Sequence, residues 1–350
     1  MSKRLYIVSF ISLLLSLYSC ERRPLIDRSE EILVRVEMSV NTIVNVATQI
    51  YNEHVVVPKV EPELICVLFY DPMSHRQVMQ TFLNTISKDE KGNYVISGNV
   101  KIQPGVYDML CYNFDTSATL VRNDYSWKAI EAYTEEVTDN KHVDVLTRGI
   151  AGRITHIPDH LLVARKKGLR IDASSETIVI KTSASSIIQS YYVQLRLKNA
   201  QYVSTASAIL TGLAPSNRLG ENEVDSLSSS GVFFTMRPSR DKHQKAGEDD
   251  VLCAVFNTFG KLPNHKSQLK ILLNGITANG KPIQEIIDMD EVFKTELAIK
   301  NHWLLLDQVI EVPQPDGEDD GGSEGGGDSS GGGFNPEVND WEEERGEITI

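Results

Sequence analysis

Hydrophobic and polar residues alternate along many short segments of this chain. Between residues 31 and 40, apolar side chains fall on every second position and charged or polar side chains lie between them. The same alternation runs through residues 190–199. A period of two residues places successive side chains on opposite faces of an extended backbone. These segments are therefore predicted to be β-strands with one buried face.

Continuous apolar runs and turn signals extend this pattern. Residues 64–70 form an apolar run of strand length, and Asp71-Pro72 follows it as a turn signal. Pro104-Gly105 and Asn279-Gly280 also separate strand-like segments, because proline presets φ while glycine and asparagine accept a positive φ. Later strand-like segments span residues 168–173, 176–183, 200–212, 231–237, 250–260, 267–280 and 302–312.

Two segments have helical rather than strand character. Residues 123–139 carry Trp127, Ile130 and Tyr133 three positions apart. This spacing predicts an amphipathic helix that covers a sheet. Residues 282–301 are expected to hold a second, short helix.

The many short strands predict a mainly β protein. Strands at this spacing are typical of β-sandwiches, and the length allows two of them. We expect two tandem antiparallel β-sandwich domains of transthyretin or immunoglobulin type, with few short helices. The domains are placed at residues 32–165 and 166–314, with the boundary near residues 150–168.

The composition changes beyond residue 314. Residues 315–333 consist mostly of Gly, Asp and Ser, which predicts a flexible linker. Residues 334–350 contain Trp341, Ile348 and Ile350. Because large apolar side chains are uncommon in disordered tails, we predict a terminal strand segment here.

The negative charge of the chain is concentrated in this C-terminal part. The whole sequence of 350 residues has a net charge of −13. Twelve acidic residues and one arginine lie beyond residue 314, so the rest of the chain is close to neutral. No basic stripe is present, and nucleic acid is therefore not expected as a partner.

The N-terminal residues have the order of a secretion signal. A basic n-region precedes an apolar stretch from Leu5 to Leu17, which is shorter than the ~20 residues of a membrane span. The letters LYSC at residues 17–20 match a bacterial lipobox, except for a tyrosine where a small residue is usual. We predict removal of residues 1–19, lipid on Cys20 and a lipidated lead to residue 31. An ordinary signal peptide followed by a chance cysteine is the alternative.

Three further cysteines, Cys66, Cys111 and Cys253, lie in apolar strand-like runs. An odd number in an exported protein excludes full internal pairing. We interpret them as small buried hydrophobic residues. The sequence leaves open whether Cys66 and Cys111 form a disulfide across neighbouring strands.

The sequence carries no recognisable catalytic or metal-binding motif. Patterns for serine hydrolases, zinc proteases and phosphate-binding loops are absent. His156 and His160 are four residues apart, but Pro158 interrupts the helix that this spacing needs. A loop crossing between the domains is therefore favoured here over a metal pair. The acidic residues 316–328 are spaced too irregularly for a calcium loop. We therefore expect no catalytic residues, no metal and no cofactor, and hence no enzyme.

Three stretches resemble a known family. They are PGVYDMLCYNFD at residues 104–115, YYVQLRLKNAQYVSTASAILTGLAPS at residues 191–216, and the closing Trp341 with EITI at residues 347–350. Together with the lipobox, they make the chain resemble the fimbrillin-like lipoproteins of Bacteroidetes, which are fimbrial anchor and accessory subunits. The resemblance covers nearly the whole mature chain.

This resemblance implies a structural role in the cell envelope. The chain would be a non-catalytic subunit of a fimbria, held in the outer membrane by lipid on Cys20 and joined to other fimbrial subunits by β-strand complementation. The donor would be residues 341–350, with Trp341, Ile348 and Ile350 as contact residues. Strict alternation places Trp341 on the opposite face from the two isoleucines, and the segment could instead fold back on its own domain. A surface-facing position is favoured over a periplasm-facing one, and cleavage after an arginine stays open.

Two other functional classes compete with this interpretation. One is a surface glycan-binding lipoprotein, for which Tyr191, Tyr192 and Trp127 could form a sugar platform if they were exposed. The other is a hydrolase of unrecognised type.

Overall fold

The structure is a computed structural model of the whole chain. It divides into two compact units, Met1–Pro315 and Asp316–Ile350. It describes residues 31–40, 60–90, 92–138, 141–150, 152–239, 250–275 and 282–314, all of which belong to the first unit. These residues confirm the predicted fold class: they are mainly β, with few short helices.

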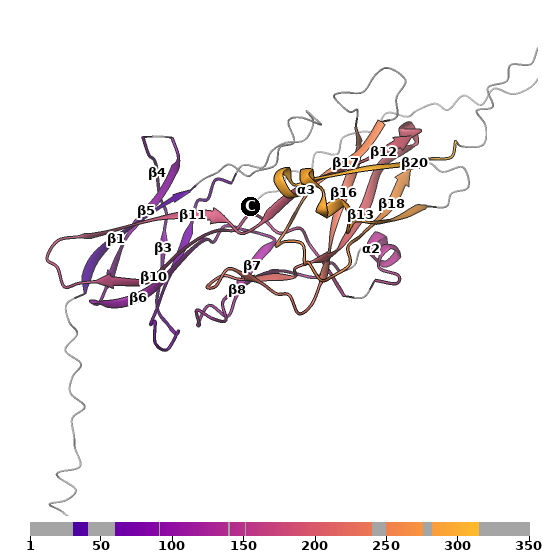
Figure 1. Cartoon of the computed structure of the whole chain (residues 1–350). Helices are drawn as coiled ribbons and strands as arrows, with labels where there is room; N and C mark the ends of the chain where they lie inside the picture. Colours follow the sequence, from indigo (N-terminus) through magenta and orange to yellow (C-terminus); the bar gives the residue numbers. More distant parts are fainter. Residues whose placement is uncertain are drawn as a thin grey trace, which may run out of the picture. The chain divides into compact units, whose positions relative to one another are not determined.

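The first sheet orders eight strands so that it folds into two layers. In sheet order they are β3 (Gln77–Leu83), β2 (Ile65–Tyr70), β6 (Gly105–Asn113), β10 (Leu162–Ile171), β11 (Ile178–Ser186), β1 (Ile32–Val40), β5 (Tyr94–Ile102) and β4 (Thr85–Lys88) (Figure 1). The pairing of β10 with β11 is short, from Leu162 with Ser186 to Val163 with Ser185. At the other end only Asn84 separates β3 from β4. The two layers enclose one apolar core, which includes Val34, Val36 and Met38 of β1.

The second sheet forms another sandwich in the same way. Its order is β19 (Ile283–Asp288), β18 (Gln268–Gly275), β13 (Val203–Leu213), β16 (Ser230–Ser239), β17 (Asp250–Thr258), β12 (Gln189–Lys198) and β20 (Trp303–Glu311), with β9 (Arg153–Thr155) beside β16. Pairing between β16 and β17 covers only the far end of β16, from Arg237 to Ser239. The sheet therefore divides there into two layers around a second apolar core.

A small third sheet is built from both halves of the chain. Its order is β15 (Glu223–Val224), β14 (Ser216–Arg218), β8 (Glu131–Thr134) and β7 (Thr119–Arg122). An apolar cluster joins residues of this layer to the outer face of β2 and β6. All six residues of β2 are consequently buried, as its continuous apolar run predicts.

Trp127 lies in this third core. Its side chain is 1% exposed, and its ring meets the edge of Tyr70 at a centroid distance of 5.6 Å. The indole Nε1 donates to Glu221 at 2.9 Å. Lys167 forms an ion pair with the same carboxylate at 2.8 Å and lies 5.3 Å from the centre of the Trp127 ring. One buried indole thus connects the first sheet to a loop of the second half of the chain.

The helix predicted for residues 123–139 is wrong. Residues 126–130 form a single turn, with the amides of Ala129 and Ile130 both donating to the Ser126 carbonyl. The chain then continues as β8, which pairs with β7 and β14. The spacing of Trp127 and Ile130 fits one turn as well as a helix, and pairing with these two strands makes the next residues a strand.

The described residues contain two short α-helices. The one expected within residues 282–301 is confirmed as α3 (Glu296–Asn301), which begins where Thr295 accepts from the amide of Ala298. The second, α2 (Lys141–Leu146), packs Val143 and Leu146 against β13 and β18. Among the described residues, no helix has the length and apolar content that a membrane span requires.

The strand order interleaves the two sandwiches in sequence. β10 contains residue 165 and pairs with β6, and β11 pairs with β1, so both lie in the first sheet. β9 precedes them in the chain but pairs with β16 of the second sheet. Each sheet therefore takes strands from both sides of the boundary expected at residue 165.

The buried cysteines do not form the disulfide that the sequence left open. β2 and β6 are neighbours, but Cys66 lies opposite Tyr112 and Cys111 lies opposite Val67. Adjacent positions of a strand point to opposite faces, so Cys66 faces the third core and Cys111 the first. Burial raises the pKa of both thiols.

Replacing Gly220 by alanine should destabilise the contact around Trp127. The added Cβ would lie 2.1 Å from the Trp127 carbonyl oxygen, which is backbone and cannot move alone. We expect a loss of about 1–3 kcal/mol, typical of overpacking, measured by urea denaturation. Gly105→Ala is the control, because its Cβ would meet only the Tyr107 side chain, at 3.1 Å or beyond. Equal losses for the two variants would contradict this explanation.

Candidate functional site

The residues predicted to contact partners lie outside the described part of the chain. Cys20, Trp341, Ile348 and Ile350 all fall in this group. Lipid attachment and strand donation at these positions therefore stay predictions.

The aromatic residues considered for a sugar platform are buried. Tyr191, Tyr192 and Trp127 are 6%, 0% and 1% exposed. Tyr191 stacks between Phe256 and His302 within the second sandwich. The three side chains therefore form no sugar platform, because a stacking surface must be open to its ligand.

The second sandwich has strand edges that could accept an extended peptide. Within the described residues, β19 pairs only with β18, and β20 pairs only with β12. Such edges expose backbone N–H and C=O groups. The register between β12 and β20 shifts after Gln194. Gln194 pairs with Leu305, but Arg196, two residues later, pairs with Val309, four residues later. A bulge of this kind bends one half of the edge relative to the other.

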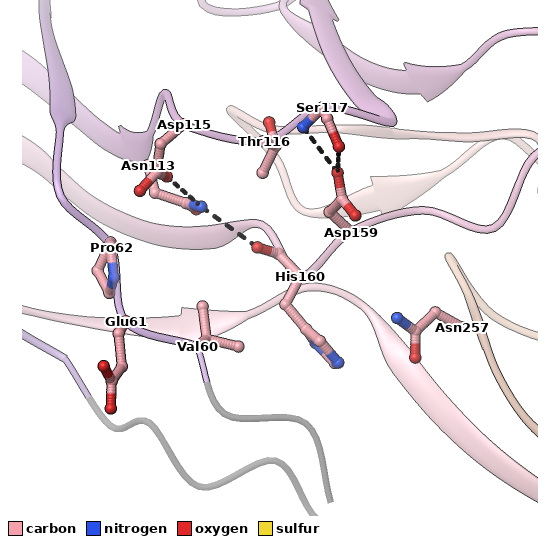
Figure 2. A pocket seen from close by; sticks show the side chains of 10 residues that line it. All are labelled: Val60, Glu61, Pro62, Asn113, Asp115, Thr116, Ser117, Asp159, His160 and Asn257. Carbon is pink, nitrogen blue, oxygen red and sulfur yellow. Dashed lines mark hydrogen bonds between the residues drawn. The ribbon is translucent and has the colours of Figure 1, made fainter. Parts of the chain in front are cut away.

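The clearest polar site lies where segments of the two sandwiches meet. A cavity of about 350 Å³ is lined by Val60, Glu61, Pro62, Asn113, Asp115, Thr116, Ser117, Asp159, His160 and Asn257 (Figure 2). Asn113 ends β6 of the first sandwich, and Asn257 belongs to β17 of the second. Asp159 and His160 come from the segment between β9 and β10. The site is thus assembled from parts of the chain that are far apart in sequence.

His160 connects strands of both sandwiches. Its side chain is buried, and its Nδ1 lies 3.0 Å from the Ser186 hydroxyl of β11. Its Nε2 lies 3.0 Å from the Ser190 hydroxyl of β12. Ser190 donates to the Asn257 side-chain oxygen at 2.6 Å, which leaves its oxygen to accept from His160. The neutral tautomer with a proton on Nε2 therefore suits this network.

Two carboxylates of the cavity, those of Asp115 and Asp159, stabilise its loops. Asp159 accepts from the backbone amides of Ser117 at 2.8 Å and Ala118 at 2.6 Å. Asp115 accepts from the amide of Glu63 at 2.7 Å and from the Asn113 side chain at 3.1 Å. Over the described residues, no group of three or more His, Cys, Asp or Glu side chains could hold a metal ion. Asp115 and Asp159 are thus engaged in holding the loops that line the cavity.

The sequence predicts a loop crossing between the domains at residues 156–160, but it does not identify the polar contacts of that loop. Ser190 and Asn257 lie within strand-like runs. Ser190 and Asn257 are polar residues within mainly apolar strands. This could have indicated a buried hydrogen-bond network, because a buried polar group needs a partner. Those partners come from distant strands, so the signal could not be interpreted from spacing alone.

Comparison with known proteins shows which family the chain belongs to. The model of a family described as "Domain of unknown function (DUF5119)" matches residues 19–234, which is more than half of the sequence. The chain belongs to the DUF5119 family. This family assignment covers the first sandwich and part of the second.

One curated protein and several solved structures are similar to this DUF5119 protein. A Bacteroides ovatus protein (strain ATCC 8483), provisionally assigned as fimbrium anchoring subunit Fim4B, is 23% identical over 243 residues, or 67% of each chain. The crystal structure of a Bacteroides ovatus protein provisionally assigned as an adhesin has a TM-score of 0.55 at 19% identity. It covers 85% of this chain and 98% of its own. The fimbrial anchor protein Mfa2 of Porphyromonas gingivalis gives a TM-score of 0.45 at 11% identity, covering 80% and 90%.

These comparisons confirm the resemblance predicted from the sequence. The DUF5119 protein is related to a fimbrial subunit of Bacteroides and shares its fold with a solved protein of the same genus. The sequence motifs at residues 104–115 and 191–216 lie within the family match.

The stability of this DUF5119 protein should decrease at mildly acidic pH through His160. Burial lowers the pKa of His160 from its ordinary 6.5, and the nearby Asp159 opposes the shift in part. As the pH falls, His160 therefore binds a proton more readily in the unfolded chain than in the folded chain. The contribution of His160 to the free energy of unfolding is fully present above about pH 6.5 and decreases at lower pH. Urea midpoints at about pH 7.5 and about pH 5 should differ more for the wild type than for His160→Gln.

The exposed His156 provides the matched control, since His156→Gln should keep the wild-type pH dependence. An unchanged pH dependence in His160→Gln would contradict the assignment to His160.

Proposed function

We propose that this protein is a non-catalytic subunit of a fimbria, acting as its membrane anchor or as an accessory subunit. The observation that carries the proposal is the similarity to a fimbrium anchoring subunit over two thirds of both chains. The fold is also similar to that of a protein provisionally assigned as an adhesin, and the match covers 98% of that protein. This similarity supports a role in adhesion or fimbriae. The engaged carboxylates at the sandwich junction agree with a structural role.

Attachment to the outer membrane would occur through lipid on Cys20. The cysteine follows an apolar stretch and a small residue in the order that lipoprotein signals have. Each buried CH₂ of an acyl chain contributes about 0.8 kcal/mol, so two or more chains on one residue bind a membrane stably. The lead from residue 20 to residue 31 would connect the lipid to β1.

Joining to other subunits would occur by β-strand complementation. An extended segment adds to a sheet edge through backbone hydrogen bonds, and pockets for alternate side chains select the partner. The chain offers both sides of this interaction. Residues 341–350 are the candidate donor, and the free sides of β19 and β20 are candidate acceptors among the described strands.

Replacing Cys20 should abolish lipid attachment. Wild-type protein grown with alkyne-palmitate should carry the label, whereas Cys20→Ala should not, because no other residue is placed to be acylated after signal cleavage. Cys66→Ala is the matched control, since Cys66 is buried in β2 and should not affect labelling. Persistent label on Cys20→Ala would contradict the lipobox assignment.

Removing residues 335–350 should abolish capture of the fimbrial partner if the segment is a donor strand. The measurement is pull-down from cells that express the other subunits, together with the thermal midpoint of the truncated protein. Ile348→Asp with Ile350→Asp should have the same effect, because charged side chains do not fit apolar pockets. Glu342→Gln is the control for charge alone.

Full capture by the truncated protein would refute strand donation. A lower thermal midpoint with full capture would instead indicate that the segment folds onto its own domain.

A further inference from the structure

A second cavity lies beside the connections at one end of the second sandwich. It has a volume of about 460 Å³ and is lined by Lys261, Pro263, Asn264, His265, Lys266, Asp290, Phe293 and Lys294. One wall is the loop between β17 and β18, and the other is the segment between β19 and α3. This volume is within the range of cavities that hold small ligands.

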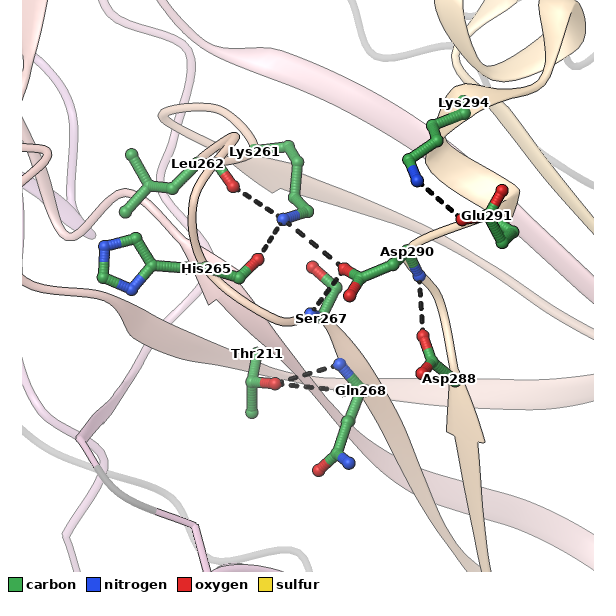
Figure 3. A network of polar contacts seen from close by, with 10 residues as sticks. All are labelled: Thr211, Lys261, Leu262, His265, Ser267, Gln268, Asp288, Asp290, Glu291 and Lys294. Atoms are coloured by element: carbon green, nitrogen blue, oxygen red, sulfur yellow. Dashed lines mark hydrogen bonds and ion pairs between the residues drawn. The ribbon is translucent and has the colours of Figure 1, made fainter.

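Lys261 holds the first wall in place. Its ammonium donates to the carbonyls of Leu262, at 2.6 Å, and His265, and it lies 3.8 Å from Asp290 (Figure 3). Two hydrogen bonds and one ion pair thus engage the ammonium. Burial lowers the pKa of Lys261, and Asp290 opposes this shift. Lys261 is therefore occupied by the protein and is not available to a ligand.

The two walls are fixed to each other and to the sheet. Asp290 accepts from the amide of Ser267 at 2.9 Å, which ties the second wall to the first. Gly212 of β13 approaches the loop so closely that a Cβ there would lie 2.5 Å from the Lys266 carbonyl oxygen. Its φ of 78° is also one that favours glycine. A cavity with preformed walls loses little entropy when a ligand binds.

The polar groups that remain open toward a ligand are mainly donors. Lys266 has no ion-pair partner among the described residues. Lys294 pairs with Glu291 at 2.6 Å, but these side chains are 69% and 85% exposed, so the pair is weak and exchangeable. The carboxylate of Asp290 is engaged as described, and Asp288 accepts from the Asp290 amide. The carboxylates of Glu291, Asp290 and Asp288 raise the pKa of Lys294. An incoming anion would therefore have to replace Glu291 at Lys294 and would find Lys266 without an ion-pair partner among the described residues.

An aromatic ring adds an apolar surface to the same cavity. Phe293 is half-buried and lines the cavity together with Pro263. Tyr191 contacts the Phe293 ring edge-on at 5.5 Å, which fixes its orientation. A ring beside cationic donors suits a ligand with one apolar face and one carboxylate. A sugar acid has both, because its C–H groups gather on one face of the ring.

We propose that this cavity binds a carboxylated monosaccharide unit, such as a uronic acid, with Lys266 and Lys294 as donors to the carboxylate and Phe293 against the sugar ring. The site goes beyond the proposed fimbrial role and does not depend on strand complementation. It would give a fimbrial subunit direct contact with acidic glycans. An acidic peptide would use the lysines equally well but would leave Phe293 without a matching surface.

The test is saturation-transfer NMR on the full chain in detergent, with D-glucuronate, D-glucose and hexaglutamate as probes. D-Glucuronate should bind with its ring hydrogens saturated, and D-glucose should bind about tenfold more weakly, because charge-assisted hydrogen bonds are lost. Lys266→Ala and Lys294→Ala should each weaken glucuronate binding several-fold. Lys300→Ala is the matched control, since this exposed lysine of α3 pairs with Glu296 and does not line the cavity.

A fourth variant separates the ring from the charges. Phe293→Leu keeps apolar volume but removes the aromatic face, so it should weaken both sugars while leaving the salt dependence of glucuronate binding unchanged. The proposal is overturned if glucuronate does not bind, or if it binds no more tightly than glucose. It is also overturned if Lys266→Ala behaves like Lys300→Ala, or if hexaglutamate binds in place of the sugar acid.

Discussion

The burial of Trp127 is the interaction on which the arrangement of the described chain depends. The outer face of β2 and β6 is apolar, and an apolar face of this size must be covered. The cover consists of β7, β8, β14 and β15, strands that come from both halves of the sequence. Trp127 fills the space between cover and sheet, and Glu221 satisfies its indole nitrogen. Truncating a buried side chain of this size costs about 3–5 kcal/mol, which is a large share of the stability of a typical domain.

The polar junction around His160 adds specificity to this apolar contact. A buried imidazole with both nitrogens in hydrogen-bond contact lies against the short link between β11 and β12, where the chain passes from the first sandwich to the second. Asn113 strengthens the same region by accepting from the amide of Leu162 at 2.6 Å and donating to the His160 carbonyl. Apolar surfaces alone can slide, whereas a satisfied hydrogen-bond network has one geometry. The apolar contact around Trp127 and the hydrogen bonds around His160 together hold the two sandwiches in one relative orientation.

In the proposed role as a fimbrial subunit, the protein would transmit force between the membrane and neighbouring subunits. Force that enters one sandwich must cross the junction to reach the other, and the junction holds a buried indole, a buried imidazole and an ion pair. The strand edges of β19 and β20 lie in the second sandwich, while the predicted lipid site precedes β1 of the first. Attachment and partner contact would thus act on different sandwiches.

The sequence alone determined the features that depend on local periodicity. The alternation in residues 32–40 identified the buried face of β1, and the unbroken apolar run at residues 65–70 identified a strand buried on both sides. The family motifs were also readable, because they are short and contiguous. Tertiary structure decided everything that depends on which strands become neighbours. Trp127 and Ile130 fit a helix until β14 pairs with β8, and Cys66 and Cys111 could pair until their register places them on opposite faces. His160 acquires its role only when the link between β11 and β12, with Ser186 and Ser190, lies against it in the folded chain. The spacing of residues in the sequence carries no information about such long-range contacts.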